Sequence, residues 1–148
     1  MSLYRERLLP GPMIFVMTAL VIPASLLVFL PINLTLGVIC AAVVYGTCVI
    51  LLVIGSPWIE VTNVALLAGR ARLPLPNVGD ATGFAGAEAT QQRGPKLDSR
   101  AWLVIRGWIS PVVKVDVLDP SDPTPYWLVS TRHPKDLIAA LKKAKASD

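Results

Sequence analysis

Charge is absent from a long stretch of this 148-residue sequence, because residues 8–59 contain no Asp, Glu, Lys or Arg. A helix that crosses a lipid bilayer needs about 20 mostly apolar residues. The uncharged stretch therefore predicts two transmembrane helices that form a hairpin. It divides the chain into an N-terminal segment, residues 1–11, the hairpin, residues 12–56, and a C-terminal domain, residues 57–148.

Residue types that support catalysis and metal binding are also scarce. The chain has one histidine, His133, and two cysteines, Cys40 and Cys48, which both lie in the second apolar segment. On one helix the spacing of the cysteines corresponds to about 12 Å, which is too far for a disulfide bond. Catalysis needs a nucleophile, a base and an orienting group that converge, and no such set can be named here. We therefore expect no catalytic residue, no metal site, no cofactor and no enzymatic activity.

Charge also limits the partners of the chain. The apolar segments contain no acid, base or histidine, which argues against an ion pathway or a transport site within the membrane. The net charge of +4 is spread along the sequence. A spread excess of this size fits a membrane surface better than a nucleic acid, so we expect lipids as partners and no nucleic acid.

The hairpin carries signals for the ends of its helices. Pro12 stands at the start of the first span, residues 13–30, and Pro23 should kink that span. Asn33 is a good N-cap for the second span, residues 34–54. The first span is too long for the apolar core of a signal peptide and lacks a small-residue cleavage site. A hairpin is therefore favoured over a cleaved signal.

Two pairs of small residues lie on the second span, Gly37 with Ala41 and Ala42 with Gly46. Such pairs allow the backbones of two helices to approach closely. They predict packing against the first span. The alternatives are a homo-oligomer and docking on another membrane protein.

Basic residues flank the hairpin on both sides. Arg5 and Arg7 precede it, Arg70 and Arg72 follow it, and the turn between the spans is uncharged. The positive-inside rule then places both termini in the cytoplasm. We expect a multi-pass protein of the cell membrane with a cytoplasmic C-terminal domain.

The C-terminal domain changes to the alternating pattern of strands. We expect strands at residues 58–61, 64–68, 70–75, 101–106, 112–118 and 126–130, and a long loop at 76–95 that contains at most a short strand around 78–84. After Pro134, the apolar residues Leu137, Ala140, Leu141 and Ala144 follow helical spacing. Antiparallel strands followed by one terminal helix indicate a small α+β antiparallel barrel.

Several motifs resemble those of one family. They are residues 4–8 (YRERL), 67–75 (LAGRARLPL), 98–102 (DSRAW) and 122–132 (DPTPYWLVSTR). With the double span, they are similar to an actinobacterial family of small membrane proteins of unknown function. The strands and the terminal helix also resemble bacterial PH-like domains, which often follow paired membrane helices. This resemblance implies a membrane-anchored PH-like domain and supplies no catalytic residues.

These observations lead to one hypothesis and one alternative. The domain is expected to be a non-enzymatic interaction module that binds lipid headgroups or a protein partner at the cytoplasmic face of the membrane. Arg70 and Arg72, on one strand face, and Trp108, near a turn, are the candidate contact residues. Solvated surface is the other interpretation of both arginines. The alternative function is an accessory or assembly subunit of a larger membrane protein complex.

Overall fold

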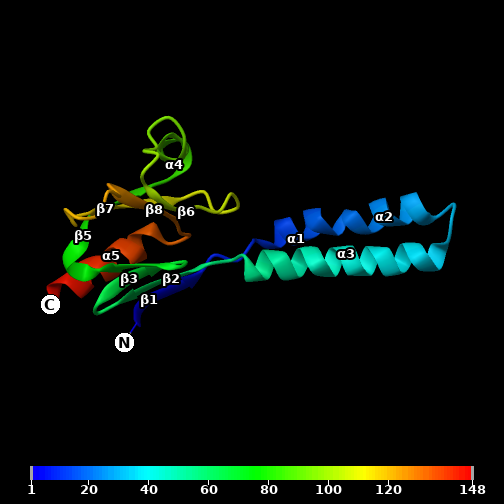
Figure 1. Cartoon of the computed structure of the whole chain (residues 1–148), viewed down its shortest axis with the longest axis horizontal. Helices are drawn as coiled ribbons and strands as arrows, with labels where there is room; N and C mark the ends of the chain where they lie inside the picture. The colour runs from blue at the N-terminus through cyan, green and yellow to red at the C-terminus, as the bar shows by residue number, and fades with distance from the viewer. Residues whose placement is uncertain (1, 148) are drawn as a thin grey trace. The chain divides into compact units, whose positions relative to one another are not determined.

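The computed structural model describes residues 2–147, which form two units (Figure 1). The first unit combines the N-terminal residues up to Leu8 with the residues from Pro57 onward. The second unit contains residues 9–56. The N-terminal segment was expected to stand apart from the C-terminal domain, but its first residues are part of that domain.

The second unit is a hairpin of helices. It consists of α1 (Pro12–Ala19), α2 (Val21–Phe29) and α3 (Leu34–Ile54). The first predicted span is interrupted at Leu20, where α1 ends, because the nearby Pro23 has no N–H to donate to the carbonyl of Ala19. Asn33 caps α3 as predicted, since its Oδ1 accepts hydrogen bonds from the amides of Thr35 (2.9 Å) and Leu36 (3.2 Å).

The small residues of α3 differ in what they contact. Gly37 and Ala41 are buried, and a Cβ added at Gly37 would lie 3.1 Å from the Cβ of Phe29 in α2. Ala42 is exposed, and a Cβ added at Gly46 would meet no atom within 4 Å. Only the first of the two small-residue pairs is therefore closely packed within the hairpin.

The first unit contains two open, four-stranded sheets. Sheet 1 is antiparallel, with the order β1 (Ser2–Arg7), β2 (Trp58–Thr62), β3 (Ala65–Ala68) and β4 (Ala71–Pro74). Sheet 2 has the order β5 (Val78–Phe84), β7 (Val112–Val117), β8 (Tyr126–Ser130) and β6 (Trp102–Val104), with β6 parallel to β8. A 3₁₀ turn, η1 (Leu75–Asn77), connects the sheets, and α4 (Gly86–Arg93) follows β5.

The C-terminal helix α5 (Pro134–Ala146) packs against strands of both sheets and lies between them (Figure 1). Its buried residues are those that the helical spacing predicted, namely Leu137, Ala140, Leu141 and Ala144. They join one core with inward residues of sheet 1, such as Ile59, and of sheet 2, such as Val115. A smaller core lies under α4, where Ala89 packs with Leu128 of β8.

The predicted barrel is wrong, because the two sheets remain separate and neither closes. The chain leaves sheet 1 after β4, where Pro74 and Pro76 have no N–H with which to extend the ladder. The helix α5 then covers the inner faces of both sheets. The structure therefore shows the strands and terminal helix of the predicted domain without the closed barrel of a PH-like fold.

The predicted loop at residues 76–95 is wrong in part, because it contains η1 and α4, and the short strand allowed around 78–84 is present as β5. The strand β5 has few apolar residues, and its glycines serve close packing instead. A Cβ added at Gly79 would lie 3.0 Å from the Cβ of Asp116, and one at Gly83 would lie 3.3 Å from Ile138. Backbone pairing with β7, which periodicity does not reveal, fixes this strand.

We predict that Gly37→Val and Gly46→Val have different effects on the hairpin. Both changes add the same side chain to α3, so their helix propensities are matched. The valine at position 37 must displace Phe29, and overpacking of this kind costs about 1–3 kcal/mol. We expect G37V to lower the melting temperature of the full chain in detergent, followed by circular dichroism, by at least about 2 °C. Equal melting temperatures for the two variants would contradict the packing described here.

Candidate functional site

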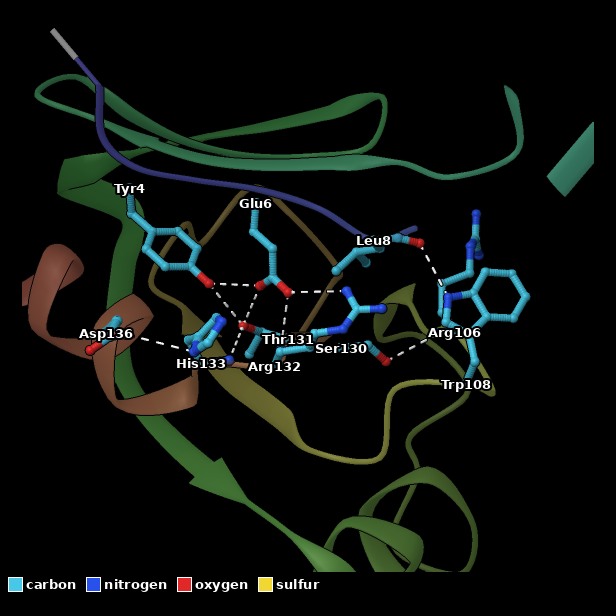
Figure 2. Close-up of polar contacts among 10 residues, drawn as sticks. All are labelled: Tyr4, Glu6, Leu8, Arg106, Trp108, Ser130, Thr131, Arg132, His133 and Asp136. Atoms are coloured by element: carbon cyan, nitrogen blue, oxygen red, sulfur yellow. Dashed lines mark hydrogen bonds and ion pairs between the residues drawn. The ribbon is translucent and has the colours of Figure 1, made fainter. Parts of the chain in front are cut away.

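Glu6 fixes the N-terminal strand to the rest of the first unit (Figure 2). Its Oε2 accepts hydrogen bonds from the hydroxyls of Tyr4 and Thr131, both at 2.6 Å, and its Oε1 accepts one from the amide of Arg132 at 3.1 Å. The Arg132 Nη1 lies 3.6 Å from the same Oε1, and the Glu6 side chain is only 10% exposed. The charge of this carboxylate is thus neutralised and hydrogen-bonded where it is removed from water.

We call the group of Tyr4, Glu6, Thr131 and Arg132 the Glu6 cluster. It joins two segments that lie at opposite ends of the sequence. Residues 4–7 form most of β1, and Thr131 and Arg132 lie between β8 and α5. Both segments belong to the motifs on which the family resemblance rests. Burial and the hydrogen bond to Glu6 raise the pKa of the Tyr4 hydroxyl above its ordinary range, so Tyr4 stays protonated and continues to donate.

The chain leaves this unit for the hairpin at one fixed place. The amide of Leu8 donates to the carbonyl of Pro57 at 3.0 Å, so the outgoing and returning segments lie side by side. Leu8 is fully buried, and its carbonyl accepts a hydrogen bond from Nε1 of Trp108 at 3.2 Å (Figure 2). Trp108, expected to be exposed, is therefore half-buried and holds this exit in place.

Arginines and a tryptophan gather on the outer face of sheet 1 at the same end. Glu6 points into the unit, so its neighbours Arg5 and Arg7 point outward. The guanidinium carbon of Arg5 lies 4.4 Å from the ring centroid of Trp58, and that of Arg7 lies 5.3 Å from it. Both distances fall within the range of cation–π interaction. Trp58 is 43% exposed and Arg5 is also exposed, whereas Arg7 is half-buried.

The register brings Arg70 and Arg72 to this end as well. Gly69, with φ +65°, makes the β3–β4 turn, and its amide donates to the carbonyl of Trp58 at 2.9 Å. Arg70 is exposed in this turn. Arg72 is exposed on β4. The register places it in one row across sheet 1 with Leu67 of β3, Glu60 of β2 and Arg5 of β1. We call the group of Arg5, Arg7, Trp58, Arg70 and Arg72 the arginine face.

Sequence reasoning nominated two members of the arginine face and missed three. Arg5 and Arg7 were used only to orient the hairpin, and Trp58 was used only as a strand residue. The sequence feature that could have indicated Arg5 and Arg7 is the alternation of charge in Arg5-Glu6-Arg7, which has the period of a strand. It is hard to recognise because the inward residue, Glu6, is not apolar.

Other titratable residues have local partners. Asp98 pairs with Arg100 at 3.0 Å, and this contact lowers the pKa of the carboxyl. His133 precedes α5, with its Nδ1 3.9 Å from Asp136. A hydrogen bond from Ser121 lowers the pKa of Asp119 in the turn before β8. Within residues 2–147, no three His, Cys, Asp or Glu side chains are grouped closely enough to hold a metal ion.

A depression of about 200 Å³ lies between helices of the hairpin. Its lining side chains come from α2 and α3 and are all apolar: Ile22, Leu26, Val38, Ala41 and Ala42. It therefore supplies no side-chain ligand for an ion. We take the arginine face as the candidate binding site.

Comparison with known proteins supports one statement about this chain. The sequence profile of DUF3093, described as a protein of unknown function, matches residues 3–141. Neither the curated proteins nor the solved structures include a significant match. The profile covers both the Glu6 cluster and the arginine face.

Glu6→Gln and Glu60→Gln form a matched pair that tests the Glu6 cluster. Both are glutamates on neighbouring strands of sheet 1, but Glu6 faces inward and Glu60 faces outward. An amide at position 6 cannot accept all the donors around it, so we expect E6Q to lower the free energy of unfolding by about 1–3 kcal/mol. E60Q should change it by at most about 0.5 kcal/mol. Urea unfolding of the full chain in detergent, followed by tryptophan fluorescence, measures both; equal losses would refute this role of Glu6.

Alkaline pH tests the Tyr4 hydroxyl. Above about pH 10, the unfolded chain loses the phenolic proton, whereas the raised pKa keeps it in the folded state. The stability that Tyr4 contributes is therefore complete below pH 10 and declines above it. We expect Tyr4→Phe to lower the urea midpoint at pH 8 but to reduce the further fall between pH 9 and pH 11. An unchanged fall would exclude Tyr4 as its source.

Proposed function

We propose that this chain, which belongs to the DUF3093 family of proteins of unknown function, is a non-enzymatic membrane protein. It crosses the cell membrane twice and presents its first unit as an interaction module at the cytoplasmic surface. The module binds lipid headgroups or a protein partner. This role is the one that the resemblance to PH-like domains implies, and it does not require a closed barrel.

Two helical segments have the length and composition of membrane spans. Pro12–Phe29 has 18 residues and Leu34–Ile54 has 21. At 1.5 Å per residue they extend about 27 Å and 31 Å, close to the thickness of a bilayer core. Their apolar side chains face outward, with 0% and 11% of the two segments buried. A core helix of a water-soluble domain would instead be mostly buried.

The pairing of β1 with β2 is the observation that carries the proposal. Arg7 pairs with Trp58 and Glu6 pairs with Ile59, although the hairpin separates these residues in sequence. If the helices span a membrane, residues 2–8 and 57–147 must then lie on the same side. An even number of crossings meets this requirement. Removal of the first helix as a signal peptide would also remove β1 and the Glu6 cluster.

The basic residues favour the cytoplasmic side. All four arginines of the arginine face lie in the segments that flank the hairpin, and the turn between α2 and α3 has no charge. This is the distribution of a positive-inside protein. Trp58 follows the end of α3 by four residues, at most about 14 Å of chain. The arginine face therefore lies within reach of the headgroups.

An accessory subunit of a larger complex is the second candidate. It is favoured by exposed apolar residues on β6, an edge strand of sheet 2, where Trp102 is 40% and Leu103 is 43% exposed. The exposed Ala42 and the open space at Gly46 offer a second contact surface on α3. Purification in mild detergent distinguishes the two candidates, because a subunit would retain stoichiometric partners.

Thiol labelling tests the proposed topology. In a background of Cys40→Ala and Cys48→Ala, single changes Ser2→Cys and Ser147→Cys place thiols at exposed positions near the two ends. We expect a membrane-impermeant maleimide to label neither in intact cells and both after permeabilisation. Ile32→Cys, in the turn between α2 and α3, is the control that should react in intact cells.

Two labelling results would contradict the proposed topology. Reaction of only one terminal thiol in intact cells would contradict the pairing of β1 with β2. Reaction of both would preserve the pairing and reverse the orientation.

A further inference from the structure

We infer that the arginine face binds the phosphate groups of anionic phospholipids in the leaflet to which the hairpin tethers it. This inference rests on the proposed function and names the ligand of the module. The face carries four arginines from β1, β4 and the β3–β4 turn, and the guanidinium groups of Arg5 and Arg7 lie against one exposed indole. Glu60 is the carboxylate on the same strand face, so positive charge remains in excess.

The arginines are held in an arrangement that suits phosphate. Arg5 and Arg7 lie against Trp58, which restricts their side chains before any ligand binds. A guanidinium group can donate two parallel hydrogen bonds to one phosphate, and it is weakly hydrated. Binding therefore costs little side-chain entropy and little desolvation energy. From β1 to β4 the face spans three strand spacings, about 14 Å. This width accommodates more than one phosphate group.

The hairpin tether favours a lipid over other phosphates or acidic peptides. Trp58 and Arg7 lie only a few residues from the ends of α3 and α1, so lipid phosphates are always at high local concentration. Exposed tryptophan is typical of the membrane interface, where one edge of the ring is apolar and the other is wet. A soluble anion would use the guanidinium groups but not the indole.

The terminal lysines provide a matched control at the other end of the unit. Lys142 and Lys143 are exposed near the end of α5. Their neighbour Lys145 donates to the carbonyl of Val78, which begins β5, whereas the arginine face lies where β2 begins. Changing Lys142 and Lys143 to Gln removes two positive charges from the chain without altering the proposed site.

Native mass spectrometry of the full chain in neutral detergent tests the inference. The probes are phosphatidylglycerol and phosphatidylcholine with identical acyl chains, so hydrocarbon contacts are matched. We expect phosphatidylglycerol to bind the wild type at least tenfold more tightly. The double variant Arg70→Gln/Arg72→Gln should lose about 25-fold in affinity for phosphatidylglycerol, about fivefold per arginine. Its affinity for phosphatidylcholine, whose phosphate charge is offset by the cationic choline, should fall much less.

The controls separate this inference from the proposed function. Lys142→Gln/Lys143→Gln should keep its phosphatidylglycerol affinity within twofold of the wild type. Equal binding of both lipids by the wild type, or equal losses in the two double variants, would overturn the lipid site. If thiol labelling then still places both termini in the cytoplasm, the membrane module stands and only its ligand is wrong. If labelling places the termini on opposite sides, the module itself fails.

Discussion

The structure depends on one strand pairing, that of β1 with β2, which closes the chain across the whole hairpin. Bringing two segments together across a loop of this length costs entropy, although the cost grows only slowly with loop length. The Glu6 cluster helps to offset it, because Glu6 accepts two hydrogen bonds from Thr131 and Arg132 and makes a charge contact with Arg132. The burial of Leu8 adds an apolar contribution. Because β2 follows the hairpin in sequence, sheet 1 is complete only after both helices have been made.

The same strand builds the candidate site. Side chains alternate along a strand, so the inward direction of Glu6 fixes the outward direction of Arg5 and Arg7. The register then sets Arg7 opposite Trp58, and the Gly69 turn adds Arg70 beside them. Fold and site are therefore coupled. Loss of the β1 pairing would separate Arg5 and Arg7 from the rest of the arginine face even with every arginine retained.

Sequence patterns predicted the features that depend on local periodicity. The helices of the hairpin, the strand β8 and the apolar stripe of α5 were all confirmed, because burial on one face leaves a regular spacing. Features that depend on distant backbone pairing were missed: β1, whose inward residue Glu6 is charged, and the parallel pairing of β6. The strand β5, which packs through glycines, was expected only as a short strand within a loop. The site followed the same division. Arg70 and Arg72 were predicted from alternation, whereas Trp58 joined them only through the fold.

Hydrogen exchange tests the central claim, the pairing of β1 with β2, most directly. The full chain in a lipid nanodisc is transferred to deuterated water, and exchange is followed in peptides that cover residues 2–8 and 58–62. Because both segments lie in the ladder of one sheet, the amides that pair across it should be protected to a similar degree. Exchange of residues 2–8 at the rate of an unstructured tail, with residues 58–62 still protected, would contradict the account.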